Sequence, residues 1–153
     1  MTIFERIQAR LDEAGAAYHV SHHAPTRTSA DASRIRNVPL HEGAKALVLR
    51  LSKSDTYILC VIPAHLRLDG KKVQALVGHR ISFASDPETI VGCTPGSVPP
   101  YGSILGLKTY CDVRLKDTPT IHFNAGSLTD SITMSSDDYF KTEQPELVDI
   151  TES

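Results

Sequence analysis

The sequence has no tryptophan, only three cysteines and no long apolar run, and each scarcity narrows the class of protein. Cys60, Cys93 and Cys111 lie far apart and form no CxxC pair, which argues against a disulfide framework or a zinc knuckle. No apolar stretch approaches the ~20 residues that span a bilayer. The N-terminal stretch MTIFERIQAR lacks the apolar segment of a signal peptide. We therefore expect a cytoplasmic protein with no membrane partner.

A basic excess is also missing, since 16 lysines and arginines face 18 acidic residues and the formal net charge is -2. This balance argues against broad nucleic-acid binding, so we expect no DNA partner, but it permits contact with one end of a nucleic acid. The 153 residues are 41% apolar and 22% charged, which is typical of a globular domain. We expect a single domain over 1–153, with a core at about 3–141 and an acidic, mostly loose tail at 142–153.

Hydrophobic periodicity predicts a mixed α/β or α+β fold in which helices cover a sheet. Capping and turn signals place helices at 2–15, 28–36, 69–78, 85–92 and 135–140, the second with Thr28 or Ser29 as N-cap. Runs rich in β-branched and apolar residues predict strands at 17–22, 45–52, 56–62, 80–84, 108–113, 120–125 and 130–134. The segments 45–52 and 56–62 form a predicted hairpin, and LVDI in the tail is a possible edge strand.

Lys45 is the first unusual residue, because it begins the run KALVLRL, which is otherwise apolar enough to be buried. A lysine at the mouth of such a strand is normally a solvated strand end. The functional alternative is a cation aimed into a pocket, where it would hold a phosphate or a carboxylate.

The loop GCTPGSVPPYG, residues 92–102, combines three glycines with three prolines. A plain structural interpretation is a stiffened turn. The chemical alternative is that the stretch GSV exposes backbone N–H groups to a carbonyl oxygen or an oxyanion, since the flanking prolines have none to offer. No GxGxxG or GxxxxGK[ST] pattern is present, so a nucleotide-phosphate loop is not indicated.

Two further polar segments have a structural and a functional interpretation. FNAGSLTDSI, residues 123–132, is typical of a hairpin turn, but Asn124 and Ser127 would also offer hydrogen bonds at the rim of a cleft. His19, His22 and His23 cluster without acidic residues at a useful spacing, which indicates solvated histidines rather than a metal site. We expect no metal and no cofactor.

Four motifs appear in an order that resembles the YbaK/ProX family of aminoacyl-tRNA editing domains, which occur free-standing and attached to prolyl-tRNA synthetases. The similarity covers about residues 3–141, and the motifs are GAKALVLR, VIPAHLRLDGKKV, FASDPETIVGCTPGSVPPYG and IHFNAGSLTDSITMSSDDY. The resemblance implies a mixed α/β fold with a central barrel-like sheet. It also implies an enzyme that hydrolyses the ester joining a wrong amino acid to tRNA.

The resemblance also implies site residues. The family's lysine at the start of the KALVL-type strand is important for activity, and Lys45 matches it. Substrate-binding positions follow from the glycine-rich loop, the FNAG turn and the segment that opens the second helix: Gly96, Ser97, Val98, Pro99, Asn124, Ala125, Gly126, Ser127, Thr28 and Ser29. Lys45 would pair with the terminal phosphate, loop N–H groups would bind the oxyanion, and the substrate's own ribose hydroxyl or thiol would assist.

The expected function is therefore that of a trans-acting aminoacyl-tRNA deacylase, which contacts the acceptor end of a mischarged tRNA with or without a synthetase partner. Family members clear alanine, cysteine, serine or threonine, and tRNA-Pro or tRNA-Ala is the expected carrier. One alternative is a binding module that has kept the fold without the reaction. Another is a thiol-dependent hydrolase that uses Cys93.

Overall fold

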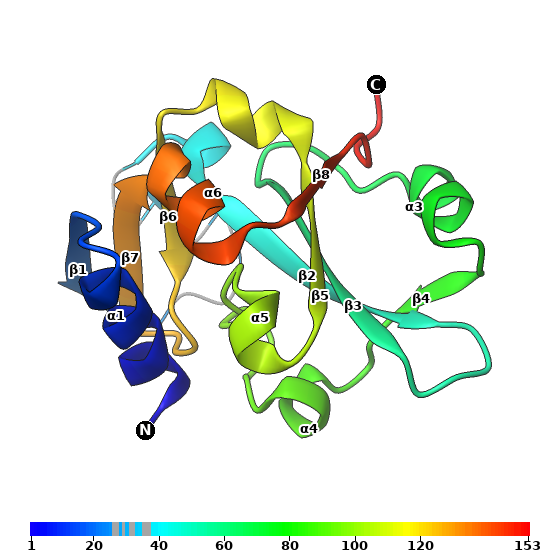
Figure 1. The fold of residues 1–153 in the computed structure, drawn as a ribbon, viewed down its shortest axis with the longest axis horizontal. Coiled ribbons are helices and arrows are strands. Elements are labelled where there is room, and N and C mark those ends of the chain that lie inside the picture. Colours follow the sequence, from blue (N-terminus) through cyan, green and yellow to red (C-terminus); the bar gives the residue numbers. More distant parts are fainter. Residues whose placement is uncertain (26–27, 29, 31–32, 35–37) are drawn as a thin grey trace.

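The strands of the protein form two sheets with helices packed around them, as the computed structural model shows (Figure 1). It describes residues 1–25, 28, 30, 33–34 and 38–153. The helix predicted at 28–36 and its N-cap candidate Ser29 lie largely outside these described residues. The mixed α/β class predicted from the sequence is confirmed.

The eight strands in the described part of the chain lie close to their predicted positions. Their bounds are β1 Tyr18–His22, β2 Ala44–Leu51, β3 Tyr57–Pro63, β4 Ile81–Phe83, β5 Lys108–Asp112, β6 Thr120–Asn124, β7 Asp130–Ser135 and β8 Glu146–Val148. One sheet has the antiparallel order β1-β7-β6. The other has the order β4-β2-β3-β5-β8 and is mixed, because β3, β5 and β8 run parallel.

The helices include three short elements that the sequence reasoning did not predict: η1 Leu40–Glu42, α5 Gly102–Leu105 and η2 Val113–Asp117. The predicted ones are α1 Ile3–Glu13, α3 Gly70–Val77, α4 Pro87–Val91 and α6 Ser136–Glu143. The N-cap residues explain where α1 and α3 begin. Thr2 and Glu5 form the expected reciprocal capping box of α1, and the Asp69 side chain accepts from two N–H groups of α3. The unpredicted elements span only three to five residues each, too few to show a periodic pattern.

The core divides into two clusters that share β3 as a common wall. Leu59 and Val61 face the larger cluster, which packs against the three-stranded sheet and α1. Ile58, Cys60 and Ile62 face the second cluster, on the side of α3. Because both faces of β3 are buried, its sequence is a continuous apolar run rather than an alternating one. A bridge from Gly43, just before β2, to His122 of β6 brings the two sheets together at this point.

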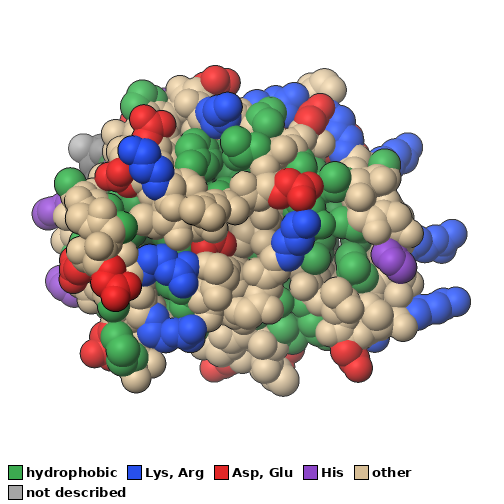
Figure 2. Space-filling model, viewed as in Figure 1, with side chains coloured by type: hydrophobic (Ala, Val, Ile, Leu, Met, Phe, Trp, Pro, Cys, Tyr) green, Lys and Arg blue, Asp and Glu red, His purple; other side chains and the backbone are tan. Residues whose placement is uncertain are grey.

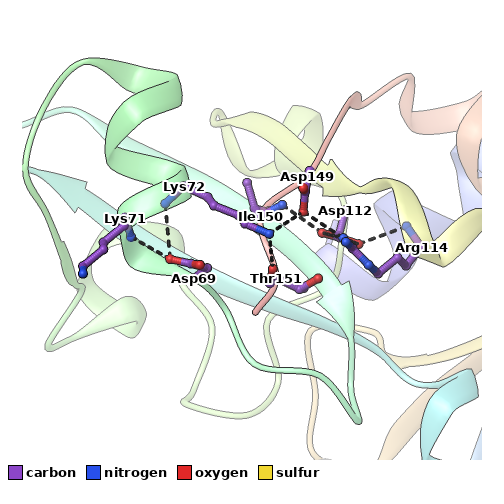
Figure 3. A network of polar contacts seen from close by, with 8 residues as sticks. All are labelled: Asp69, Lys71, Lys72, Asp112, Arg114, Asp149, Ile150 and Thr151. Carbon is purple, nitrogen blue, oxygen red and sulfur yellow. Dashed lines mark hydrogen bonds and ion pairs between the residues drawn. The ribbon is translucent and has the colours of Figure 1, made fainter. Parts of the chain in front are cut away.

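The C-terminal residues are packed, contrary to the expectation of a mostly loose tail. The predicted edge strand forms as β8, which pairs with β5, and Figure 1 shows it alongside that strand. Glu143 is buried and accepts hydrogen bonds from Ser103 and Thr109. Ile150 is also buried, and its N–H donates to the Asp112 carboxylate at 2.9 Å (Figure 3). The acidic composition misled the prediction, because Glu143 is buried with hydrogen-bond donors and β8 pairs with the edge of the sheet.

The buried thiols predict that the protein loses stability at alkaline pH. Burial raises the pKa of Cys60 from 9.0 to about 12 and that of Cys93 to about 11, and it also raises the pKa of Cys111. Above pH 9 the unfolded chain releases these protons while the folded chain keeps them. The free energy of unfolding should therefore fall as the pH rises from 9 to 11, by up to about 1.4 kcal/mol per pH unit for each thiol.

Urea unfolding at pH 8 and pH 10.5 measures this effect, and Cys60→Ala should show a smaller difference between the two values. Equal unfolding free energies for the wild-type protein at both pH values would contradict the prediction.

Candidate active site

A cavity of about 250 Å³ opens where the start of β2, the segment around η1, the glycine-rich loop and β6 meet. Five of the residues predicted from the sequence line it: Lys45, Thr28, Gly96, Val98 and Asn124. They come from four separate segments of the chain. The remaining lining residues are Ser33, Val38, Pro39, Leu40, Gly43, Ala44, Ala46, Leu47, His122 and Phe123. The described lining residues therefore combine a lysine with both polar and apolar groups.

Lys45 is the second residue of β2 and is exposed at the cavity. Its backbone pairs with Ile62 of β3, which places it in a regular ladder and holds its Cα firmly. Within the described part of the chain, its ammonium group makes no hydrogen bond or ion pair. A cation that is held by its backbone and not neutralised by a carboxylate of the described residues can bind an anionic ligand.

The glycine-rich loop turns at Pro95 and Gly96. The Ser97 N–H donates to the Thr94 carbonyl at 2.9 Å, and the Ser97 hydroxyl donates to the same oxygen at 2.7 Å. Gly96 adopts a φ of +88°, which a residue with a side chain would occupy only with strain. The turn uses the Ser97 N–H, so this group is not the free donor that the sequence indicated. The N–H groups of Gly96 and Val98 have no partner among the described residues and remain available.

Asn124 connects β6 to the glycine-rich loop. Its Nδ2 donates to the Gly96 carbonyl at 2.8 Å, and its Oδ1 accepts from the Ser131 hydroxyl at 3.1 Å. The Ser131 hydroxyl lies 2.5 Å from His23 Nε2, which continues the chain of polar groups to the end of β1. The side chain of Asn124 thus fixes the position of Gly96 relative to the sheet.

Several predicted binding residues do not line the cavity. Ser97, Pro99 and Ala125 are buried behind it, and Gly126 donates its N–H to the Ser97 carbonyl at 2.9 Å. A Cβ at Gly126 would lie 2.8 Å from Ile3, so the glycine there allows α1 to approach closely. Ser127 accepts from the Thr129 N–H and stabilises the hairpin turn, which is its structural interpretation. These residues support the loop and the turn rather than face a ligand.

His122 is the cavity residue that the sequence reasoning missed. Its side chain is 7% exposed, and its ring lies between Glu42 and Thr133. The strand pattern could have indicated this residue. Side chains two residues apart in a strand point to the same face, and His122 is two residues before the predicted site residue Asn124.

The other histidines and the cysteines form no second site. His22 contacts Asp130 near the surface, and among the described residues no group of three or more histidine, cysteine or acidic side chains is placed to hold a metal.

Cys93 is fully buried, and burial raises the pKa of its thiol to about 11. It does not line the cavity. A protonated, buried thiol is a poor nucleophile, which argues against the thiol-dependent alternative.

The family of aminoacyl-tRNA editing domains matches residues 23–142, which is most of the chain. The chain belongs to this family. The multifunctional Ser/Thr-tRNA deacylase ProXp-y of Escherichia coli, from strain K12 and from O157:H7, is 33% identical over 150 residues, covering 94% of this chain and 90% of its own. The family predicted from the sequence is therefore confirmed.

Solved structures agree on the fold of this editing domain. A crystal structure described as that of a candidate trans-editing enzyme for prolyl-tRNA synthetase superposes with a TM-score of 0.84 at 23% identity, covering 100% of this chain and 99% of that one. A hypothetical protein superposes with a TM-score of 0.86 at 20% identity, covering 96% and 99%. In the described part of the editing domain, no helix is long and apolar enough to cross a membrane.

Proposed function

We propose that this protein is a trans-acting deacylase that hydrolyses the ester between serine or threonine and a mischarged tRNA. The predicted enzyme class, a deacylase of aminoacyl-tRNA, is confirmed by the family match together with the ProXp-y relative. The choice of serine and threonine rests on the name of that relative. Alanine and cysteine, and tRNA-Pro or tRNA-Ala as the carrier, remain part of the proposal.

The observation that carries the proposal is that Lys45, Gly96 and Val98 line one cavity, and that the N–H groups of Gly96 and Val98 have no partner among the described residues. Lys45 pairs with the terminal phosphate of the tRNA and positions its 3′ end. A water attacks the ester carbonyl, and the N–H groups stabilise the oxyanion that forms on the carbonyl oxygen. The bond between the carbonyl carbon and the ribose oxygen then breaks, and the ribose oxygen leaves as a hydroxyl that carries the proton given up by the attacking water. Because the loop is rigid, its donors need little rearrangement when the charge develops.

The net charge and the face shown in Figure 2 support recognition of the acceptor end rather than of a whole tRNA. On the face that Figure 2 shows, lysine and arginine side chains are interspersed with acidic ones, and no broad basic patch is visible. The formal net charge of -2 agrees with this distribution. We therefore propose that the protein acts in the cytoplasm and that a synthetase supplies additional affinity for the tRNA.

A panel of mischarged tRNAs tests the proposal. Purified protein is incubated with seryl-, threonyl-, alanyl- and cysteinyl-tRNA, on tRNA-Pro and tRNA-Ala as well as on other carriers, and release of the labelled amino acid is measured. We expect release from at least one seryl or threonyl substrate, above the spontaneous rate. Binding without release across the whole panel would favour the non-catalytic binding module instead.

A further inference from the structure

His122 and Asn124 project from one face of β6 toward the cavity, and each is bonded to the residue opposite on β7. In the strand register His122 faces Thr133 and Asn124 faces Ser131. His122 Nδ1 lies 2.7 Å from the Thr133 hydroxyl, and the Ser131 hydroxyl donates to Asn124 Oδ1 at 3.1 Å. The two cross-strand pairs lie parallel, one residue pair apart on the same face.

On the other side, each of the two side chains reaches a different wall of the cavity. Asn124 donates to the Gly96 carbonyl of the glycine-rich loop. His122 Nε2 lies 2.7 Å from Glu42 Oε1, at the end of η1, where the neighbouring Leu40 and Gly43 line the cavity. His122 therefore fixes the η1 wall to β6 in the same way that Asn124 fixes the loop wall.

The hydrogen bonds also fix the orientation of the His122 ring. The Glu42 carboxylate accepts, so Nε2 carries a hydrogen, while Nδ1 shares a hydrogen with the Thr133 hydroxyl. Rotation of the ring would break both bonds and leave the nitrogens of the buried His122 side chain without these partners. With both nitrogens in hydrogen-bond contact with these partners, the ring lines the cavity in a fixed orientation. It forms a rigid part of the wall.

We propose that His122, held between Glu42 and Thr133, limits the size of the amino-acid side chain that the cavity admits. A rigid ring in a close-packed wall does not move aside for extra methylene groups, so serine and threonine fit where leucine does not. This inference rests on the proposed deacylase function. It assigns selectivity to a residue outside the glycine-rich loop.

The experiment compares seryl and leucyl esters of the same tRNA in the wild-type protein and in His122→Ala. We expect the leucyl-to-seryl ratio of kcat/KM to rise about tenfold or more in the variant. His122→Leu, of nearly equal volume, should keep the wild-type ratio. Glu42→Ala and Thr133→Val release one side of the ring and should give intermediate ratios. Glu42→Gln keeps an oxygen that accepts from Nε2 and should resemble the wild type.

A purely structural role predicts a different pattern, in which His122→Ala lowers both rates by one factor and leaves the ratio unchanged. That result would overturn the inference. If His122→Ala fails to fold, an unchanged ratio in both Glu42→Ala and Thr133→Val overturns it equally.

Binding separates this inference from the proposed function. The non-hydrolysable 3′-amide analogues of seryl- and leucyl-adenosine are titrated against the same variants by calorimetry. A wild-type protein that releases no amino acid from any tRNA of the panel refutes the deacylase proposal. The role of His122 is still tested in that case, because the ratio of the affinities for the leucyl and seryl analogues should rise in His122→Ala.

Discussion

Lys45→Ala is expected to lower kcat/KM for the hydrolysis of a mischarged tRNA by about 10²–10³-fold, a loss typical of removing one preorganised electrostatic contact. The side chain is exposed and has no partner in the described part of the chain. Its removal leaves no buried group unpaired, so the free energy of unfolding should stay within about 0.5 kcal/mol of the wild type. Activity and stability are thus expected to separate in this variant.

Salt dependence identifies the contact that is lost. If Lys45 pairs with a phosphate, the slope of log kcat/KM against log salt concentration should become shallower by about 0.7–1 in Lys45→Ala. Lys71→Ala is the matched control, because Lys71 is an exposed lysine on α3 that does not line the cavity. It should keep the wild-type rate and slope. Full activity of Lys45→Ala would refute the role assigned to this residue.

Asp112→Ala is expected to lower the free energy of unfolding by about 3 kcal/mol, because a buried carboxylate with several donors is removed. Figure 3 shows Asp112 between Arg114 and the backbone of Ile150. It accepts from the Arg114 N–H at 2.9 Å and from the Ile150 N–H at 2.9 Å, and it pairs with the Arg114 guanidinium at 3.2 Å. Its loss leaves the buried Ile150 N–H without a partner.

Asp149→Ala provides the contrast within the same network. Asp149 pairs with Arg114 and Lys72, and the hydrogen bond from Arg114 contributes most to lowering the pKa of its carboxyl group. Its side chain is 54% exposed, so solvent screens both ion pairs and the loss of stability should be far smaller than in Asp112→Ala. Urea unfolding measures both variants. Hydrogen exchange should show faster exchange of the C-terminal amides, the Ile150 N–H among them, only in Asp112→Ala. Equal stability of the two variants would contradict the assignment.

The sequence predicted correctly those features that depend on residues close together in the chain, such as helix caps and hairpins. Thr2 and Glu5 cap the same short segment, and Asp69 lies directly before the helix that it caps. The hairpin of β2 and β3 follows from two apolar runs separated by a short polar turn. The motif order also indicated the editing family, and with it Lys45, Gly96, Val98 and Asn124 as residues that meet at one site.

Contacts between residues far apart in the chain could not be predicted from the sequence. Glu42 and His122 are 80 residues apart, and they meet only because a bridge joins Gly43 to β6. Asp112 and Ile150 are 38 residues apart, so the acidic tail had no visible partner in the linear sequence.

The sequence by itself determined the longer helices and strands and the family, and it predicted Lys45 as the cation of the site, since capping, strand patterning and motif order are local properties. The tertiary structure alone decided which loop N–H groups stay free, which predicted residues face away from the cavity and which histidine lies in its wall. The physical reason is that hydrogen bonds between distant segments depend on how the two sheets pack. No local pattern encodes that packing.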